Sequence, residues 1–190
     1  MSIFKMILSF APWIAFLIIS GPTMFRLKLG IVVAAILVVV MGVTRLHRGV
    51  ILWAGVLFFL YALIAVVWMN NMWSVRYMGV LANGTLAAGT WLTVLMGKPF
   101  TLDYAKEHTD PSLWDSPVFL KTNYVITCAW GVVFILGVLN AWLKMQHLAV
   151  PHWVFEAVQY SCMLGAMFFT NWYTAYVKRQ RGDSPKAVTE

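Results

Sequence analysis

Charged residues are scarce in this sequence. Only 11% of its 190 residues are Asp, Glu, Lys or Arg, whereas 61% are apolar and 15% are aromatic. A water-soluble domain has about a quarter of its residues charged. The excess of apolar residues cannot be buried in one soluble core, because too few polar residues remain to cover its surface. Composition therefore excludes an ordinary soluble domain and predicts an all-α integral membrane protein.

Residues that commonly carry out chemistry are also few. The two cysteines, Cys128 and Cys162, lie in apolar segments, so no disulfide framework is expected. His147 and His152 are five residues apart without a zinc pattern around them, and no histidine is placed deep in a span as a haem ligand. No Ser-His-Asp or nucleophilic cysteine pattern is present. We therefore predict no cofactor and no bound metal, and the sequence assigns no catalytic residue.

The net charge of +7 arises because Lys and Arg outnumber Asp and Glu by 14 to 7. In a soluble protein this excess would suggest a nucleic-acid partner. In a membrane protein it indicates loops that face an anionic leaflet. We therefore expect membrane lipids, anionic ones included, as partners, and no nucleic acid.

Charged residues divide the chain into six apolar stretches. A helix rises about 1.5 Å per residue and needs about 20 apolar residues to cross the hydrocarbon core. Pro12, Gly21 and Pro22 interrupt the first stretch, so five spans with a shallow first helix are the alternative. The sequence predicts one transmembrane domain over 1–177 and a basic cytoplasmic tail over 178–190, with spans at about 6–25, 29–44, 50–72, 77–97, 122–143 and 152–177.

Basic residues predict the orientation, because Lys and Arg near span ends are retained in the cytoplasm. With six spans, four of them fall on one side, namely Arg26, Lys28, Arg76 and Lys144. The other ten fall on the side of both termini. We expect a multi-pass membrane protein with both termini in the cytoplasm. With five spans the C-terminus is still cytoplasmic.

Glu156 is the only acidic residue within a predicted span. Helical spacing places it on one face with His152 and Gln159. An intramembrane carboxylate suggests proton coupling or ligand contact. The alternative is structural, because Glu156 lies only one and a half turns from Pro151 and can reach the headgroup region.

Two further stripes of small and polar residues lie in the predicted fourth and fifth spans. Asn83 and Thr90 lie in the first stripe with Gly79 and Ala87, and Asn123 lies in the second with Thr127 and Gly131. Such stripes indicate close helix contacts joined by hydrogen bonds. The alternative is a path for a solute.

The predicted cytoplasmic loop, 98–121, is the only segment with soluble character. Gly97 and Pro99 predict a helix end, and a short interfacial helix is expected to follow near Thr101. We identify this loop as a candidate partner-contact surface through Lys98, Phe100, Asp103, Tyr104, Glu107 and Trp114. The tail offers Lys178, Arg179 and Arg181 to lipid headgroups. The acidic residues of the loop match no known metal signature of lipid-transferring enzymes.

Several residues suggest a family. Phe10-Ala11-Pro12 opens the first apolar segment, Lys98-Pro99 closes the fourth span, and Trp114 precedes the fifth, which offers Lys121, Asn123, Trp130, Phe134, Gly137 and Asn140. In these residues the chain resembles the bacterial intracellular septation protein A family. The resemblance implies a role in cell-envelope maintenance and division through contacts with other membrane proteins, with no family-wide catalytic residues.

Three functions follow from these observations. The first is an interaction protein of the inner membrane that contacts membrane-protein partners, lipids or further copies of itself. The second is a transporter of a small solute or a lipid that uses the polar faces of the fourth to sixth spans. The third, less supported, is a lipid-modifying enzyme that uses the acidic loop.

Overall fold

The structure is a computed structural model that describes residues 10–21, 23–44, 49–106, 109–146 and 150–182, with the backbone alone for 181–182. Every regular element in these ranges is a helix. The α-helices are α2 (Ala11–Ile19), α3 (Met24–Val43), α4 (Val50–Ala62), α5 (Met72–Arg76), α6 (Met78–Leu95), α7 (Thr101–Lys106), α8 (Pro117–Met145) and α9 (His152–Gly182). A π-helix, η1 (Leu63–Trp68), continues α4, and a short 3-10 helix, η2 (Pro111–Leu113), precedes α8.

Among the described residues, four helices are long and apolar enough to cross a membrane: α3, α4 together with η1, α6 and α8. They correspond to the second to fifth predicted spans, so the chain is an α-helical, multi-pass membrane protein. In the first predicted span the described helix, α2, has only nine residues. In the sixth, α9 has 31 residues but is less apolar than α8. Four of the six predicted spans are therefore present as long apolar helices.

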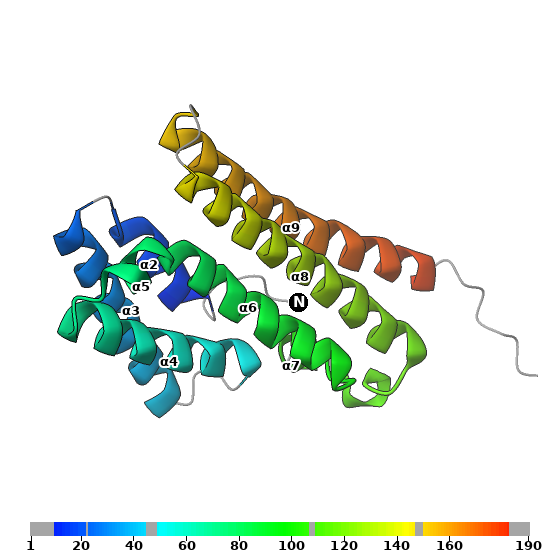
Figure 1. The fold of residues 1–190 in the computed structure, drawn as a ribbon. Coiled ribbons are helices and arrows are strands. Elements are labelled where there is room, and N and C mark those ends of the chain that lie inside the picture. The colour runs from blue at the N-terminus through cyan, green and yellow to red at the C-terminus, as the bar shows by residue number, and fades with distance from the viewer. Residues whose placement is uncertain (1–9, 22, 45–48, 107–108, 147–149, 183–190) are drawn as a thin grey trace, which may run out of the picture.

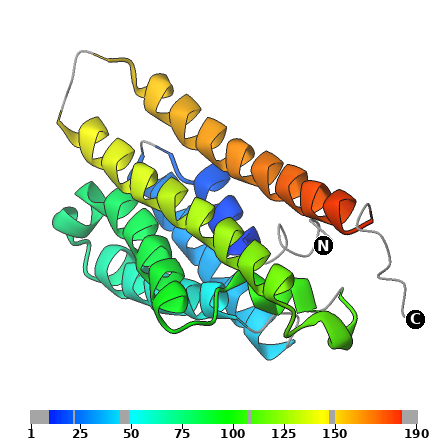
Figure 2. The same ribbon diagram turned by 90° about the vertical axis from the view of Figure 1, so that its right-hand side faces the viewer.

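The longer helices pack against their neighbours in chain order. The contacts run from α2 to α3, then to α4, α6, α8 and α9, and the α6–α8 contact is the most extensive. Figures 1 and 2 both show α8 and α9 side by side along one side of the bundle. α9 is thus joined to the bundle mainly through α8.

Helix α3 corrects the boundary between the first two predicted spans. It begins at Met24, so the first span ends before residue 25 and the second begins five residues before Leu29. Thr23 supplies the start signal, because its Oγ1 accepts a hydrogen bond of 3.3 Å from the backbone N–H of Arg26. The side chain of Arg26 then reaches back, and its Nε donates to the carbonyl oxygen of Ile19 at 3.2 Å.

A tight turn separates the third and fourth spans. The helix of the third predicted span ends at Trp68, before the predicted residue 72. Asn70 has a positive φ of 51°, a conformation that asparagine accepts more readily than most residues. Lys28 stabilises the turn, because its Nζ donates to the Asn70 Oδ1 at 2.5 Å and to the Val67 carbonyl oxygen at 3.4 Å. A cation near the last carbonyls of a helix also interacts favourably with the helix dipole.

The loop between α6 and α8 is more buried than predicted. The helix stop is confirmed, because Gly97 has a φ of +72° directly after α6. The predicted short helix is α7, but Thr101, Leu102, Tyr104 and Ala105 are buried, so its apolar side chains face the protein rather than the bilayer. Since α8 begins at Pro117, it also includes the last residues of the predicted loop 98–121.

Candidate functional site

Two of the predicted polar candidates meet between three helices. Asn83 on α6 donates through Nδ2 to the carbonyl oxygen of Gly79 at 2.9 Å, and its Oδ1 accepts from the Nε2 of Gln159 on α9 at 3.3 Å. Gly137 on α8 makes room for this amide, because an added Cβ would lie 2.7 Å from the Asn83 Cγ. A Cβ on Gly79 would likewise lie 3.1 Å from the Cβ of Ala141 on α8. The stripe therefore lies at the contact of α6 with α8.

Asn123 belongs to a second polar cluster, at the other end of the α6–α8 contact. Its Nδ2 donates to the carbonyl oxygen of Phe119 at 2.9 Å, and its own carbonyl oxygen accepts from the Oγ1 of Thr101 at 3.0 Å. The hydroxyls of Thr101 and Thr127 lie 2.9 Å apart. This cluster fastens α7 to α8.

Thr90 is fully buried on α6. Its carbonyl oxygen accepts a hydrogen bond of 2.6 Å from the Oγ1 of Thr93, and the Thr93 Oγ1 accepts from the backbone N–H of Phe100 at 3.2 Å. The hydroxyl of Thr90 has no hydrogen-bond partner among the described residues. Thr90 is thus next to the hydrogen bonds through which Thr93 holds the start of the loop against α6.

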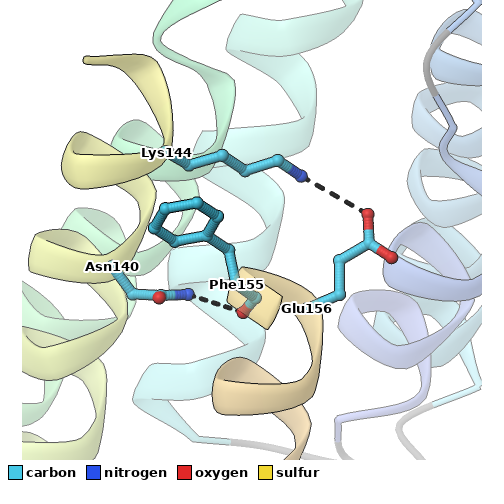
Figure 3. Close-up of polar contacts among 4 residues, drawn as sticks. All are labelled: Asn140, Lys144, Phe155 and Glu156. Carbon is cyan, nitrogen blue, oxygen red and sulfur yellow. Dashed lines mark hydrogen bonds and ion pairs between the residues drawn. The ribbon is translucent and has the colours of Figure 1, made fainter. Parts of the chain in front are cut away.

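Glu156 lies at the surface, where α8 ends and α9 begins (Figure 3). Its Oε1 is 3.4 Å from the Nζ of Lys144, and the two side chains are 60% and 38% exposed. Beside this ion pair, the Asn140 Nδ2 donates to the carbonyl oxygen of Phe155 at 2.8 Å. His152 is exposed as well. These contacts favour the structural interpretation of Glu156, as one partner in an ion pair that joins two helix ends.

Three aromatic residues named in the resemblance, Phe10, Trp130 and Phe134, lie in the core. The rings of Phe10 and Trp130 are stacked with their centroids 5.4 Å apart, and Phe134 packs against both. The Trp130 Nε1 donates to the Oγ1 of Thr170 on α9 at 3.1 Å, and Trp130 is fully buried. These aromatic residues therefore join the N-terminal segment, α8 and α9.

The loop candidates divide into buried and exposed residues. Phe100 and Tyr104 are only 1% and 3% exposed, so their side chains pack inside the protein and offer no surface to a partner. Lys98 and Asp103 are exposed. Trp114 is half-buried: its Nε1 donates to the carbonyl oxygen of Thr109 at 3.0 Å, and the Lys106 Nζ lies 5.2 Å from the ring centroid.

The remaining contact candidates lie at the edges of the described ranges. Glu107 and the side chain of Arg181 lie outside the described residues. Lys178 and Arg179 are exposed on the last turns of α9, so the start of the predicted tail is helical. Among the residues that the structure describes, no three His, Cys, Asp or Glu side chains are grouped to hold a metal ion.

A pocket of about 360 Å³ lies where the loop meets the first turns of α8 and the last turns of α9. Six residues form its apolar wall: Ala105, Leu113, Val118, Phe119, Ile126 and Val177. Its polar residues are Thr109, Asp110, Thr122, Asn123, Thr174 and Lys178. Of the predicted site residues only Asn123 and Lys178 line it. No local pattern in the sequence identifies the others, because residues 105–126 and 174–178, which meet here, are far apart along the chain.

The described fold defines the class as an α-helical, multi-pass membrane protein. None of the family models, curated proteins or solved structures compared with the chain matches it.

Proposed function

We propose that this chain is an inner-membrane protein of bacterial cell-envelope maintenance or division, and that it acts through contacts with other membrane proteins and with lipid. One observation supports this proposal. The side-chain amides of Asn83, Gln159 and Asn123, the residues predicted for transport, form hydrogen bonds within and between helices. Glu156, the best candidate for proton coupling, is 60% exposed in an ion pair. A contact function needs no polar path, whereas a transporter does. The family likeness in the residues of α8 agrees with this choice.

The same proposal includes a sixth span formed by α9. On α8, the 22 residues 122–143 lie between Lys121 and Lys144, and on α9 the 21 residues 157–177 lie between Glu156 and Lys178. At about 1.5 Å per residue each stretch is about 32 Å long, close to the thickness of the hydrocarbon core. The Lys144–Glu156 pair joins one end of this antiparallel hairpin, and Lys121 near the start of α8 and Lys178 near the end of α9 lie toward the other end.

From the excess of basic residues on the loop side we infer that both termini lie in the cytoplasm. A reporter enzyme that is active only outside the cytoplasm, fused after residue 190, tests this orientation. We expect no activity from this fusion and strong activity from the same reporter inserted after Val150. Strong activity at the C-terminus would refute the proposed orientation.

The proposed partner surface consists of the exposed side chains of Lys98 and Asp103. A photoreactive amino acid placed at either position, in the full chain at native expression, should yield a discrete adduct with another membrane protein. The matched control is Trp153, which is 67% exposed at the opposite end of the bundle. Equal adducts from Trp153, or none from the loop, would contradict a loop-centred partner surface.

A further inference from the structure

The pocket between the loop, α8 and α9 is apolar inside, although half of its residues are polar. Thr109, Thr122 and Thr174 each donate their hydroxyl to a carbonyl oxygen four residues earlier, at 2.6 to 2.8 Å. The Asn123 Nδ2 likewise donates to the carbonyl oxygen of Phe119, four residues earlier. The three threonines therefore offer no free hydroxyl hydrogen to the pocket, and Asn123 keeps one N–H beside its bond to Phe119. A wall of this kind accommodates hydrocarbon better than a polar solute.

Two residues of opposite charge, Asp110 and Lys178, line the same pocket and are exposed. Lys178 has no ion-pair partner among the described residues, so its ammonium is available. The Asp110 Oδ1 accepts a hydrogen bond of 2.9 Å from the backbone N–H of Ser112. A carboxylate has about four acceptor sites, so Asp110 keeps capacity for a cation. The pocket thus has one cationic and one anionic group beside an apolar interior.

The depth of the pocket suits a lipid. Helix α8 has 29 residues and is about 43 Å long, whereas the hydrocarbon core is about 30 Å thick. Its first turns therefore extend into the headgroup region, where Lys121 lies on the outer surface of the helix. Ile126, deeper on α8, lies more than a turn inside the hydrocarbon boundary. The charged groups of the pocket thus lie at headgroup depth and its apolar wall at acyl-chain depth.

We propose that this pocket holds a phospholipid with an ethanolamine headgroup, whose phosphate binds Lys178 and whose ammonium binds Asp110. Part of one acyl chain occupies the apolar interior beside Phe119 and Ile126. A phosphatidylglycerol headgroup would bring no cation to Asp110. A choline headgroup carries a cation but has no N–H to donate to the carboxylate. A pocket of about 360 Å³ lies at the small end of ligand sites, which fits a headgroup with part of one chain rather than a whole lipid.

Native mass spectrometry of the full chain in detergent tests this proposal with three dioleoyl lipids: phosphatidylethanolamine, phosphatidylcholine and phosphatidylglycerol. We expect phosphatidylethanolamine to bind about tenfold more tightly than phosphatidylcholine, as one charge-assisted hydrogen bond predicts. Asp110→Asn should abolish this preference while keeping an oxygen for the Ser112 N–H, and it should improve binding of phosphatidylglycerol. Lys178→Gln should weaken all three lipids by about tenfold.

Two matched variants serve as controls. Asp115→Asn and Lys121→Gln remove exposed charges from the same end of the bundle without touching the pocket, and both should bind like the unmodified chain. Equal affinity for the ethanolamine and choline lipids, or equal effects of Asp110→Asn and Asp115→Asn, would overturn the proposal. Tighter binding of phosphatidylglycerol than of phosphatidylethanolamine would show instead that the pocket takes anionic lipid. The inference rests on the proposed function only because both place the chain in a membrane. A failure to capture a partner by crosslinking and a failure to bind lipid are therefore separate results.

Discussion

Gly137 offers the sharpest test of how α6, α8 and α9 are held together. In Gly137→Ala the new Cβ would overlap the side-chain amide of Asn83, which is already held by Gly79 and Gln159. Overpacking of this kind costs about 1–3 kcal/mol, and loss of the hydrogen bond to Gln159 adds about 1 kcal/mol. Alanine regains about 0.5–1 kcal/mol through its better helix propensity. The free energy of unfolding should therefore fall by about 1–3 kcal/mol.

Gly84→Ala on α6 is the matched control, because nothing lies within 4 Å of a Cβ added there. It should leave stability unchanged or raise it by up to about 1 kcal/mol. Both variants are compared by unfolding in mixed micelles at rising SDS fraction, followed by tryptophan fluorescence. On an Asn83→Ala background, Gly137→Ala should cost less than about 0.5 kcal/mol, because the clashing amide is gone. A Gly137→Ala variant as stable as Gly84→Ala would refute the proposed close contact.

Three further variants test other contacts. Trp130→Phe should lower the free energy of unfolding by about 1–3 kcal/mol, because it removes the hydrogen bond to Thr170 and leaves a cavity in the packed core. Thr101→Val should cost about 1–3 kcal/mol in the same assay, because it leaves the Asn123 carbonyl oxygen without this donor and the buried Thr127 hydroxyl without its acceptor. Hydrogen bonding to Ser112 lowers the pKa of Asp110 from its ordinary value of 3.8, so its stabilisation of η2 should be present above that value and lost as the pH falls through the lowered pKa. Amide hydrogen exchange of the loop measures that loss, and Asp110→Asn should remove it.

Each of these variants has a control in the chain. Trp142→Phe changes a half-exposed tryptophan, and Thr122→Val removes a hydroxyl that bonds only its own helix. Both should change stability by less than about 0.5 kcal/mol. Asp115→Asn should leave the pH dependence of the loop unchanged. Equal effects in a variant and its control would show that the corresponding contact does not stabilise the protein.

Local patterns predicted the apolar helices well, because hydrophobicity and charge spacing depend only on neighbouring residues. The stripe that contains Gly79 and Asn83 was predicted as a helix contact, and it lies against α8. Its partner Gln159 could not be predicted, since that residue lies 76 positions further along the chain. For Phe100 and Tyr104, periodicity identified an apolar face correctly. It could not tell, however, whether lipid or protein covers that face.

The start of α3 differs from the prediction, because a capping residue, Thr23, determines it rather than a charged residue. The charge of Lys28 predicts a span that begins at Leu29, because a charged residue is expected to end an apolar stretch. The Thr23 cap instead begins α3 at Met24, and Lys28 lies within the helix because its ammonium reaches Asn70. A threonine directly before an apolar run is a readable start signal. The pocket, in contrast, forms only when α9 returns along α8, so no local pattern could reveal it.

We propose above all that the chain acts through contacts with other membrane proteins. Crosslinking in native membranes at native expression, followed by mild purification and native mass spectrometry, tests it most directly. We predict a stoichiometric protein partner that is retained by Glu156→Gln and lost when Lys98 and Asp103 are both replaced by Ala. A chain that emerges alone, or that carries a solute lost in Glu156→Gln, would contradict the claim and favour transport.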